Sequence, residues 1–262
     1  MLSHLLDAAI LASIEAGQAI IEIYKSDNFD IQTKSDSSPL TKADLAAHTI
    51  IIEHLKKTNI PILSEEDANI PFETRSQWDR FWLVDPLDGT KEFIKKNDEF
   101  TVNIALIEQG EPILGVIYLP VFNSIYFASA DIGSFYQNNI NKIALNTIVE
   151  KAIKLPLNTP DTYTLVGSRS HMNDLTKEYF LNVEKQQGKI NIISKGSSLK
   201  LCMVAEGSAH EYPRFGPTME WDTAAGHAIA LFSGAKVTKD DGKTDLLYNK
   251  ENLLNPYFIV KR

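Results

Sequence analysis

The stretch at residues 81–90, FWLVDPLDGT, constrains this chain more than any other, because an apolar run ends in a turn that carries two carboxylates. Pro86 fixes its own φ and has no backbone N–H, so the segment cannot be the interior of a helix. Asp85 and Asp88 are therefore expected to flank a bend after a strand, with both carboxylates folded toward one point. Gly89 allows the sharp turn that follows. Carboxylate, carbonyl and hydroxyl oxygens in one turn are ligands that Mg²⁺ prefers.

Two other segments place acids beside apolar runs. Residues 61–67, PILSEED, read as a short strand that ends in clustered acids, and like charges are not packed together without a cation or solvent to neutralise them. In residues 220–230, EWDTAAGHAIA, Asp222 is expected at the N-cap or first turn of a helix whose small residues allow close backbone approach. Taken singly, an ordinary turn, a solvated acidic loop and a capping aspartate would explain the three segments equally well.

Taken together and in this order, the segments resemble the signature of the magnesium-dependent, lithium-sensitive phosphatases that include inositol monophosphatase and fructose-1,6-bisphosphatase. That signature is an acidic pair after a strand, then D-P-[IL]-D-G-T, then W-D-x-A-A-G, and here it reads Glu65 with Glu66, residues 85–90 and residues 221–226. Within this superfamily the chain is most similar to the CysQ-type 3'(2'),5'-bisphosphate nucleotidases. This closer likeness rests on residues 63–67, 85–94, 196–200 and 212–218, and the resemblance covers essentially the whole chain.

The resemblance implies an α+β or α/β fold, a layered α/β/α/β/α sandwich of the inositol monophosphatase and fructose-1,6-bisphosphatase type. The hydrophobic pattern itself predicts two helices, the second opened by a capping box of Thr41 and Asp44. An antiparallel hairpin is expected around residues 109–111. The expected elements are helices at 2–24, 41–57, 174–186, 198–206 and 222–232, and strands at 61–63, 81–84, 100–106, 113–119, 125–128, 163–167 and 190–194.

The pattern changes character near residue 158, from antiparallel strands to alternating strands and helices. We therefore expect two lobes, although both can share one continuous core. Residues 1–157 would form an α+β lobe with most metal ligands. Residues 158–262 would form an α/β lobe with substrate-binding loops and Asp222.

The resemblance also implies how metal would be held. Glu65 and Asp85, with the carbonyl of Leu87, would bind one Mg²⁺. A second Mg²⁺ would be bound by Asp85, Asp88 and Asp222. A third ion would be held only loosely, so the site would contain two or three ions. Two ions about 3.5–4 Å apart can act on opposite ends of one displacement, one activating a water and the other neutralising the leaving oxygen.

Three residues would take part in catalysis by the same resemblance. Thr90 would orient the attacking water, Asp44 would accept its proton, and Glu65 would act as a ligand beside them. From its spacing alone, Asp44 could equally be a simple helix-start acid.

Substrate contacts are expected from two stretches of the second lobe. Residues 167–171 end a strand and residues 195–200 open a helix, whose backbone N–H groups favour an anion. Helix capping and a plain surface loop would also explain these stretches. The resemblance implies nucleoside and 5'-phosphate contacts from His171, Ser197, Lys200 and Arg214. Around the scissile phosphate it implies contacts from Glu65, Leu87, Asp88, Gly89, Thr90 and Asp222.

Composition narrows the choice of function. A formal net charge of −8 argues against binding of nucleic-acid polymers, and the single cysteine, Cys202, excludes an internal disulfide and is expected to be a buried structural thiol. No run approaches the roughly 18 apolar residues of a membrane span, so a cytoplasmic protein without an integral span is expected. No obligate protein partner is expected either. Some CysQ-type relatives lie peripherally on the cytoplasmic face of the inner membrane, so that location stays open.

The expected activity is Mg²⁺-dependent hydrolysis of the 3'-phosphate of 3'-phosphoadenosine 5'-phosphate, a small nucleotide, to AMP and phosphate, in sulfur assimilation and nucleotide recycling. An inositol-phosphate or sugar-phosphate phosphatase with the same metal core is the first alternative. A phosphoaspartyl phosphatase would need D-x-D, whereas Asp85 and Asp88 are three apart. A non-catalytic metal- or nucleotide-binding sensor is the third alternative.

Overall fold

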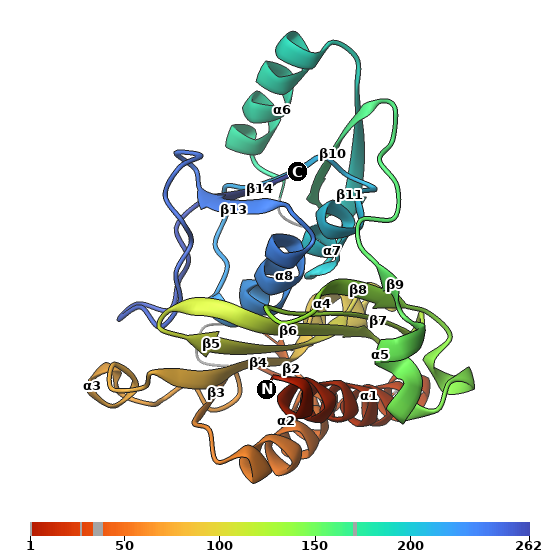
Figure 1. Cartoon of the computed structure of the whole chain (residues 1–262), viewed down its shortest axis with the longest axis vertical. Coiled ribbons are helices and arrows are strands. Elements are labelled where there is room, and N and C mark those ends of the chain that lie inside the picture. Colours follow the sequence, from red (N-terminus) through yellow and green to blue (C-terminus); the bar gives the residue numbers. More distant parts are fainter. Residues whose placement is uncertain (1, 27, 34–38, 170–171) are drawn as a thin grey trace.

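Helices and sheets alternate in five layers (Figure 1). The computed structural model describes residues 2–26, 28–33, 39–169 and 172–262. Helices α1 (Ser3–Ser26) and α2 (Lys42–Leu55) cover one face of a seven-stranded sheet, and α7 (Leu199–Glu206) and α8 (Glu220–Phe232) lie between this sheet and a five-stranded one. Helix α6 (Asp174–Gln187) covers the outer face of the smaller sheet. The predicted α/β/α/β/α sandwich is confirmed.

The large sheet has the strand order β3-β4-β5-β6-β7-β8-β9. Its strands are β3 (Ile62–Ser64), β4 (Arg80–Asp88), β5 (Thr101–Glu108), β6 (Glu111–Leu119), β7 (Ser124–Ser129), β8 (Gly133–Gln137) and β9 (Ile153–Lys154). Neighbours are antiparallel as expected, except that β3 runs parallel to β4. The carboxyl ends of β3 and β4 therefore meet at the same edge of the sheet, which becomes important for the site.

The small sheet has the order β11-β10-β12-β14-β13. Its strands are β10 (Tyr163–Ser168), β11 (Ile190–Lys195), β12 (Glu211–Arg214), β13 (Lys236–Lys239) and β14 (Phe258–Lys261). Strand β10 is parallel to both its neighbours, whereas β14 pairs antiparallel with β12 and β13. The shorter elements are β1 (Gln32–Thr33), β2 (Pro39–Leu40), α3 (Phe72–Arg75), α4 (Thr90–Ile94), α5 (Ile148–Lys151) and 3-10 turns at Lys56–Thr58, Ile140–Lys142 and Leu145–Thr147.

Two local features predicted from the sequence, a helix cap and a hairpin turn, are present in the structure. Thr41 caps α2: its hydroxyl accepts from the Ala43 amide at 3.2 Å, and the Asp44 carboxylate accepts from the Thr41 amide at 2.8 Å. This is the predicted capping box. The predicted hairpin is also present, since Glu108 pairs with Glu111 around Gln109 and Gly110, which both have positive φ (51° and 83°). That conformation is typical of a type I′ turn.

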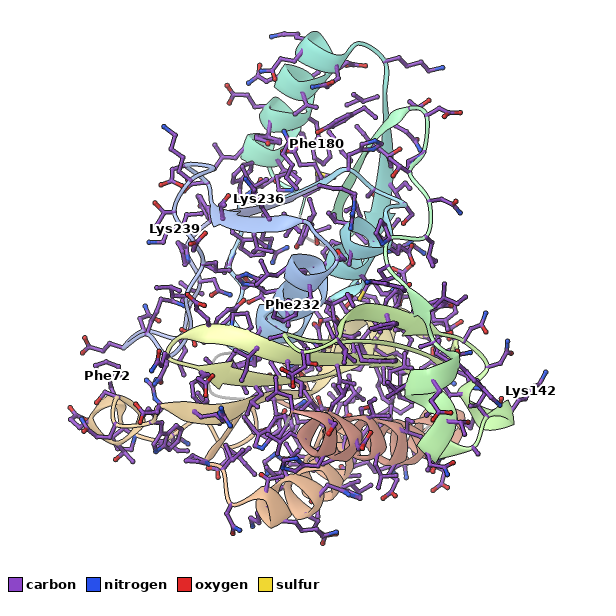
Figure 2. All side chains as sticks on the ribbon, in the orientation of Figure 1. Phe72, Lys142, Phe180, Phe232, Lys236 and Lys239 are labelled. Atoms are coloured by element: carbon purple, nitrogen blue, oxygen red, sulfur yellow. The ribbon has the colours of Figure 1, made fainter. Side chains whose placement is uncertain are left out.

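Two hydrophobic cores fill the space between the layers. One lies between the large sheet and helices α1 and α2, and the other surrounds α8 between the two sheets. Helix α8 approaches β6 very closely, because a Cβ at Gly115 would lie 2.3 Å from the Ala225 carbonyl oxygen. Phe180 of α6, labelled in Figure 2, forms a small cluster with Val183 of the same helix and Leu165 of β10. Cys202 is buried, as expected.

The core around α8 draws side chains from both sides of residue 158, so the two predicted lobes share it; the division itself stays a prediction. Within the described ranges, no helix combines the length and apolarity needed to cross a bilayer.

Candidate active site

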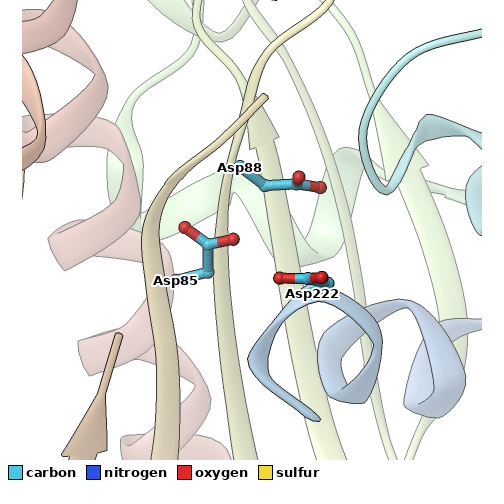
Figure 3. A group of neighbouring side chains, drawn as sticks. All are labelled: Asp85, Asp88 and Asp222. Atoms are coloured by element: carbon cyan, nitrogen blue, oxygen red, sulfur yellow. The ribbon is translucent and has the colours of Figure 1, made fainter. Parts of the chain in front are cut away.

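Three aspartates converge where the large sheet meets α8 (Figure 3). Asp85 and Asp88 come from β4 and Asp222 from the first turn of α8. One carboxylate oxygen from each lies within 4.8 Å of the others. These residues are about 135 positions apart in the chain, and only the family resemblance predicts that they converge.

An irregularity in β4 places Asp85 and Asp88 together. In a regular strand, residues three apart point to opposite faces. Here Asp85 pairs with Asn103 of β5 and Asp88 with Thr101, so β4 holds one residue more than its partner between these pairs. Such a bulge turns the following side chain toward the other face, which brings both carboxylates to one side. The Leu87 amide donates to Asp85 Oδ1 at 3.0 Å and holds the bend.

Glu65 reaches the same place from β3. Because β3 and β4 are parallel, the residue that follows β3 lies beside the end of β4, and the Glu65 amide donates to the Val84 carbonyl at 3.0 Å. The carboxylate charge of Glu65 acts on Asp85 and Asp222, whose pKa values it raises. The predicted grouping of Glu65 with the aspartates is therefore present in the structure.

Asp222 both caps α8 and joins the cluster. Its Oδ2 accepts from the Met219 amide at 2.9 Å, which is the predicted capping contact, and its carboxylate lies near those of Asp85 and Asp88. The start of α8 is held by the fully buried Glu220, whose carboxylate accepts from the amides of Asn249 (2.6 Å) and Lys250 (2.9 Å). This anchoring fixes the position from which Asp222 projects.

The cluster has the electrostatics of a cation site. Burial, followed by neighbouring charges led by Glu65, raises the pKa of Asp85 well above its usual range. Burial and the charge of Asp88 do the same for the pKa of Asp222. The pKa of Asp88 is raised by burial too, although the Lys200 ammonium and the Ser198 amide oppose that shift. Gathered oxygen ligands with mutual repulsion fit a hard divalent cation such as Mg²⁺, which relieves the repulsion when it binds.

Asp44 and Thr90 form a pair beside the cluster. The Thr90 hydroxyl lies 3.2 Å from Asp44 Oδ1 and 3.3 Å from the Leu87 carbonyl oxygen, and can donate to either. Burial raises the pKa of Asp44 to about 6, against the opposing hydrogen bonds from Thr41. Asp44 is therefore both the capping acid of α2 and a neighbour of the cluster. Gly89, with φ of 91°, makes the turn between β4 and α4 that sets Thr90 in this position.

A cleft of about 790 Å³ opens over the cluster. Among the predicted site residues, it is lined by Glu65, Asp88, Ser197, Lys200, Arg214 and Asp222. Lys200 Nζ donates to the Ser197 carbonyl, and burial lowers the pKa of Lys200 to about 8, against the charge of Asp88. Arg214, the last residue of β12, donates to the carbonyls of Gly216 and Pro217 in the loop that follows. His171 lies outside the described residues.

The backbone N–H groups of the turn before α7 have other partners than expected. Two of its backbone N–H groups, expected to receive a substrate anion, are bonded to carboxylates of this protein: Gly196 to Glu99 at 2.8 Å and Ser198 to Asp88 at 2.6 Å. Ser197, between them, has φ of 42°. These contacts join the turn to the first half of the chain.

Asn103 and Glu99 were not predicted as residues of the site. Asn103 Nδ2 lies 3.4 Å from Asp88 Oδ2, and Asn103 Oδ1 accepts from the Ser198 hydroxyl at 2.8 Å. A lone amide in the apolar run at 100–107 was the available signal for Asn103. The signal for Glu99 was weaker, since an acid before a strand is ordinary.

Comparisons with known proteins show which family the chain is similar to. The inositol monophosphatase family matches residues 1–259. The 3'(2'),5'-bisphosphate nucleotidase CysQ of Salmonella typhimurium is 49% identical over 248 residues, covering 94% of each chain. Its counterpart in Escherichia coli K12 is 47% identical over 259 residues, covering 98% of this chain and 99% of the relative.

Solved structures show the same fold. The crystal structure of CysQ from Bacteroides thetaiotaomicron superposes with a TM-score of 0.89 at 47% identity, covering 97% of this chain and 95% of that one. An inositol monophosphatase from Anabaena has a TM-score of 0.71 at 24% identity, covering 99% and 91%. The chain belongs to the inositol monophosphatase family, and within it to the CysQ type.

Proposed function

We propose that this chain is an Mg²⁺-dependent 3'(2'),5'-bisphosphate nucleotidase that hydrolyses the 3'-phosphate of 3'-phosphoadenosine 5'-phosphate to AMP and phosphate. The observation that carries the proposal is the convergence of Asp85, Asp88 and Asp222 under a cleft that also holds the cations Lys200 and Arg214. CysQ relatives named as 3'(2'),5'-bisphosphate nucleotidases, at 47–49% identity over nearly the whole chain, support it.

The carboxylates of Glu65, Asp85, Asp88 and Asp222, with the Leu87 carbonyl, would hold two or three Mg²⁺ ions. When bound, the ions activate a water and neutralise charge on the phosphate.

In the reaction, the water oxygen bonds to phosphorus while the P–O3' bond breaks, and the ribose oxygen takes up a proton. Thr90 orients the water through its hydroxyl. Asp44, with a pKa near 6, is largely ionised at neutral pH and accepts the water proton.

Selectivity would come from the far side of the cleft. Lys200 is largely protonated near pH 7, because its pKa is lowered only to about 8, and so it attracts an anion. We assign Lys200, Arg214, Ser197 and His171 to the nucleoside and its 5'-phosphate. Gly89 and Thr90 would contact the scissile phosphate together with the metal ligands. The proposed role is removal of a by-product of sulfate activation in the cytoplasm.

A phosphate-release assay with Mg²⁺ tests this function. We expect kcat/KM for 3'-phosphoadenosine 5'-phosphate to exceed that for inositol 1-phosphate and for fructose 1,6-bisphosphate. A preference for either comparison substrate would reassign the chain to an inositol-phosphate or sugar-phosphate phosphatase. Activity should disappear in excess chelator and should be inhibited by Ca²⁺, whose longer bonds misplace the reacting groups. Millimolar-range Li⁺ should inhibit as well, by analogy with the family. Full activity in chelator would exclude the metal mechanism.

A further inference from the structure

Glu99 is a buried acid bonded to Gly196, which lines the cleft, and it lies outside the three-aspartate cluster. It lies just before β5 and is 4% exposed. Its carboxylate receives three partners from the second half of the chain. Arg169 contacts it at two points, Nε to Oε2 at 2.9 Å and Nη2 to Oε1 at 2.8 Å. Lys195 Nζ lies 3.1 Å from Oε1, and the Gly196 amide donates to Oε2 at 2.8 Å.

These partners keep Glu99 ionised. Burial acts to raise its pKa, but the hydrogen bonds from Arg169, Gly196 and Lys195 outweigh burial and hold the pKa of Glu99 below its usual value. A buried ion pair gives weak support to stability, because removing two charges from water costs about as much as their attraction returns. The placement of this pair therefore suggests a geometric role.

The geometry leads from Glu99 to Asp88 in two steps. Gly196 lies so close to the first half of the chain that a Cβ there would come 2.9 Å from Glu92 Cγ and 3.2 Å from the Glu99 carbonyl oxygen. Ser197 then adopts a positive φ of 42°, a conformation that non-glycine residues hold only when their surroundings fix it. At the other end of the turn, the Ser198 amide donates to Asp88 Oδ2 at 2.6 Å. The turn at 196–198 is thus held by one carboxylate at each end.

We propose that Glu99 is a positioning residue: by holding Gly196 it fixes the 196–198 turn, so that the Ser198 amide orients the Asp88 carboxylate for metal binding. The inference rests on the proposed function, in which Asp88 is a metal ligand. In this proposal Glu99 is not a metal ligand and acts only through the turn. Arg169 acts one step further out, by fixing the rotamer in which Glu99 Oε2 faces Gly196.

Mg²⁺ binding to the substrate-free protein, measured by calorimetry, tests the inference in Glu99→Gln. Replacing a group that directly holds a metal ligand costs about 10–100-fold in affinity. Because Glu99 acts through the turn, we expect Mg²⁺ binding to weaken by about three- to tenfold. The Mg²⁺ concentration for half-maximal phosphate release should rise by the same factor. The matched control is Glu211→Gln, since Glu211 is 1% exposed and bonded by Tyr163 and Tyr179 in the small sheet. This control should leave Mg²⁺ binding within about twofold of wild type.

A double-mutant cycle separates positioning from stability alone. Arg169→Ala should also weaken Mg²⁺ binding. The double variant Glu99→Gln with Arg169→Ala should bind Mg²⁺ as tightly as Glu99→Gln alone, because both residues act through one contact. Arg169 also carries the test if Glu99→Gln does not fold, because its side chain is 47% exposed. A lowered melting temperature with unchanged Mg²⁺ affinity in these variants would overturn the inference. Absence of Mg²⁺ binding and phosphate release in the wild-type protein would instead overturn the proposed function, and the inference with it.

Discussion

Asp88 is bonded on one carboxylate oxygen by Ser198 and Asn103 and faces two other aspartates. Asp88→Asn keeps the size of the side chain and an acceptor for the Ser198 amide, but removes one unit of negative charge. We expect kcat to fall by at least about 100-fold, because a proposed metal ligand is weakened. The melting temperature in chelator should stay the same or rise, since repulsion within the cluster is reduced.

Phosphate release and thermal unfolding measure these two effects, and Asp174→Asn on the exposed start of α6 is the control. Near-normal turnover of Asp88→Asn at saturating Mg²⁺ would show that the metal assignment is wrong.

Lys200 offers a second prediction at this scale. Its ammonium is buried, bonded to the Ser197 carbonyl and 5.5 Å from the centre of the Tyr212 ring. Lys200→Ala removes a charged donor assigned to the remote 5'-phosphate. A hydrogen bond to a charged group is worth about 1.5–3 kcal/mol, so kcat/KM for 3'-phosphoadenosine 5'-phosphate should fall by roughly ten- to 150-fold.

The internal control for Lys200→Ala is a small monophosphate, for which the loss should be much smaller. Separate values of KM and kcat show whether the contact binds or aligns the substrate. Equal losses of kcat/KM on both substrates would show that Lys200 acts at the metal centre and not on the 5'-phosphate.

At the scale of the element, the turn between β4 and α4 depends on Gly89. An alanine there would adopt φ of 91° and place its Cβ 3.1 Å from the Glu99 carbonyl oxygen and 3.3 Å from Ser197 Cβ. Gly234 has nearly the same φ, 92°, with nothing within 4 Å of an added Cβ. Both alanine variants should lose about 1–2 kcal/mol of unfolding free energy from φ strain. Gly89→Ala should lose about 1–3 kcal/mol more from crowding.

Urea unfolding in chelator compares the two variants directly. We also expect Gly89→Ala, and not Gly234→Ala, to reduce phosphate release, because Gly89 joins Asp88 to Thr90. If the two variants lost equal stability and activity, the crowding at Gly89 would have no consequence.

The elements that could be predicted from sequence are those whose signals are local. The capping box at Thr41, the hairpin around Gly110 and the strand before Asp85 each depend on residues a few positions apart. Strands β12, β13 and β14 were not predicted, because each has only four residues and takes its partner from the fold. Observed helix boundaries differ from the expected ones by up to two residues. Helix α8, for example, begins at Glu220, two residues before the expected start.

In the site, too, only the features set by nearby residues could be predicted from the sequence. The bend at Pro86 was predictable, since proline and glycine restrict the backbone locally. The bulge that turns Asp88 to the side of Asp85 was not, because it is defined by pairing with Asn103 and Thr101 on β5. The contact between Glu99 and Gly196 joins residues 97 apart in the chain, and no periodicity in the sequence encodes such a pair.

At the scale of the whole molecule, stability should depend on His227, buried in α8 between the two sheets. Its Nδ1 lies 3.0 Å from the Tyr248 hydroxyl, and burial lowers its pKa from 6.5 to about 3. The unfolded chain binds a proton near pH 6.5, whereas the folded protein does not until about pH 3, so acidification favours unfolding in this range. Between about pH 7.5 and about pH 5, protonation of His227 in the unfolded chain alone should lower the free energy of unfolding by about 2 kcal/mol.

Urea unfolding at several pH values tests this contribution by comparing slopes. His227→Gln should flatten the decline toward low pH relative to wild type. His54→Gln is the control, since His54 is near the surface and paired with Glu15 at 2.7 Å. Parallel pH profiles for wild type and His227→Gln would contradict the prediction.

The position of β14 has a consequence for the order of events during synthesis. This strand lies between β12 and β13 in the small sheet, yet the ribosome makes it after both, and after α8. Until residues 258–261 emerge, β12 and β13 lack their common neighbour and the upper wall of the core around α8 is open. Helix α8, which carries Asp222, packs on β5 and β6 of the large sheet as well, so β14 completes the surroundings of this helix. We therefore expect α8 to become fully packed on both faces only after residues 258–261 have been made.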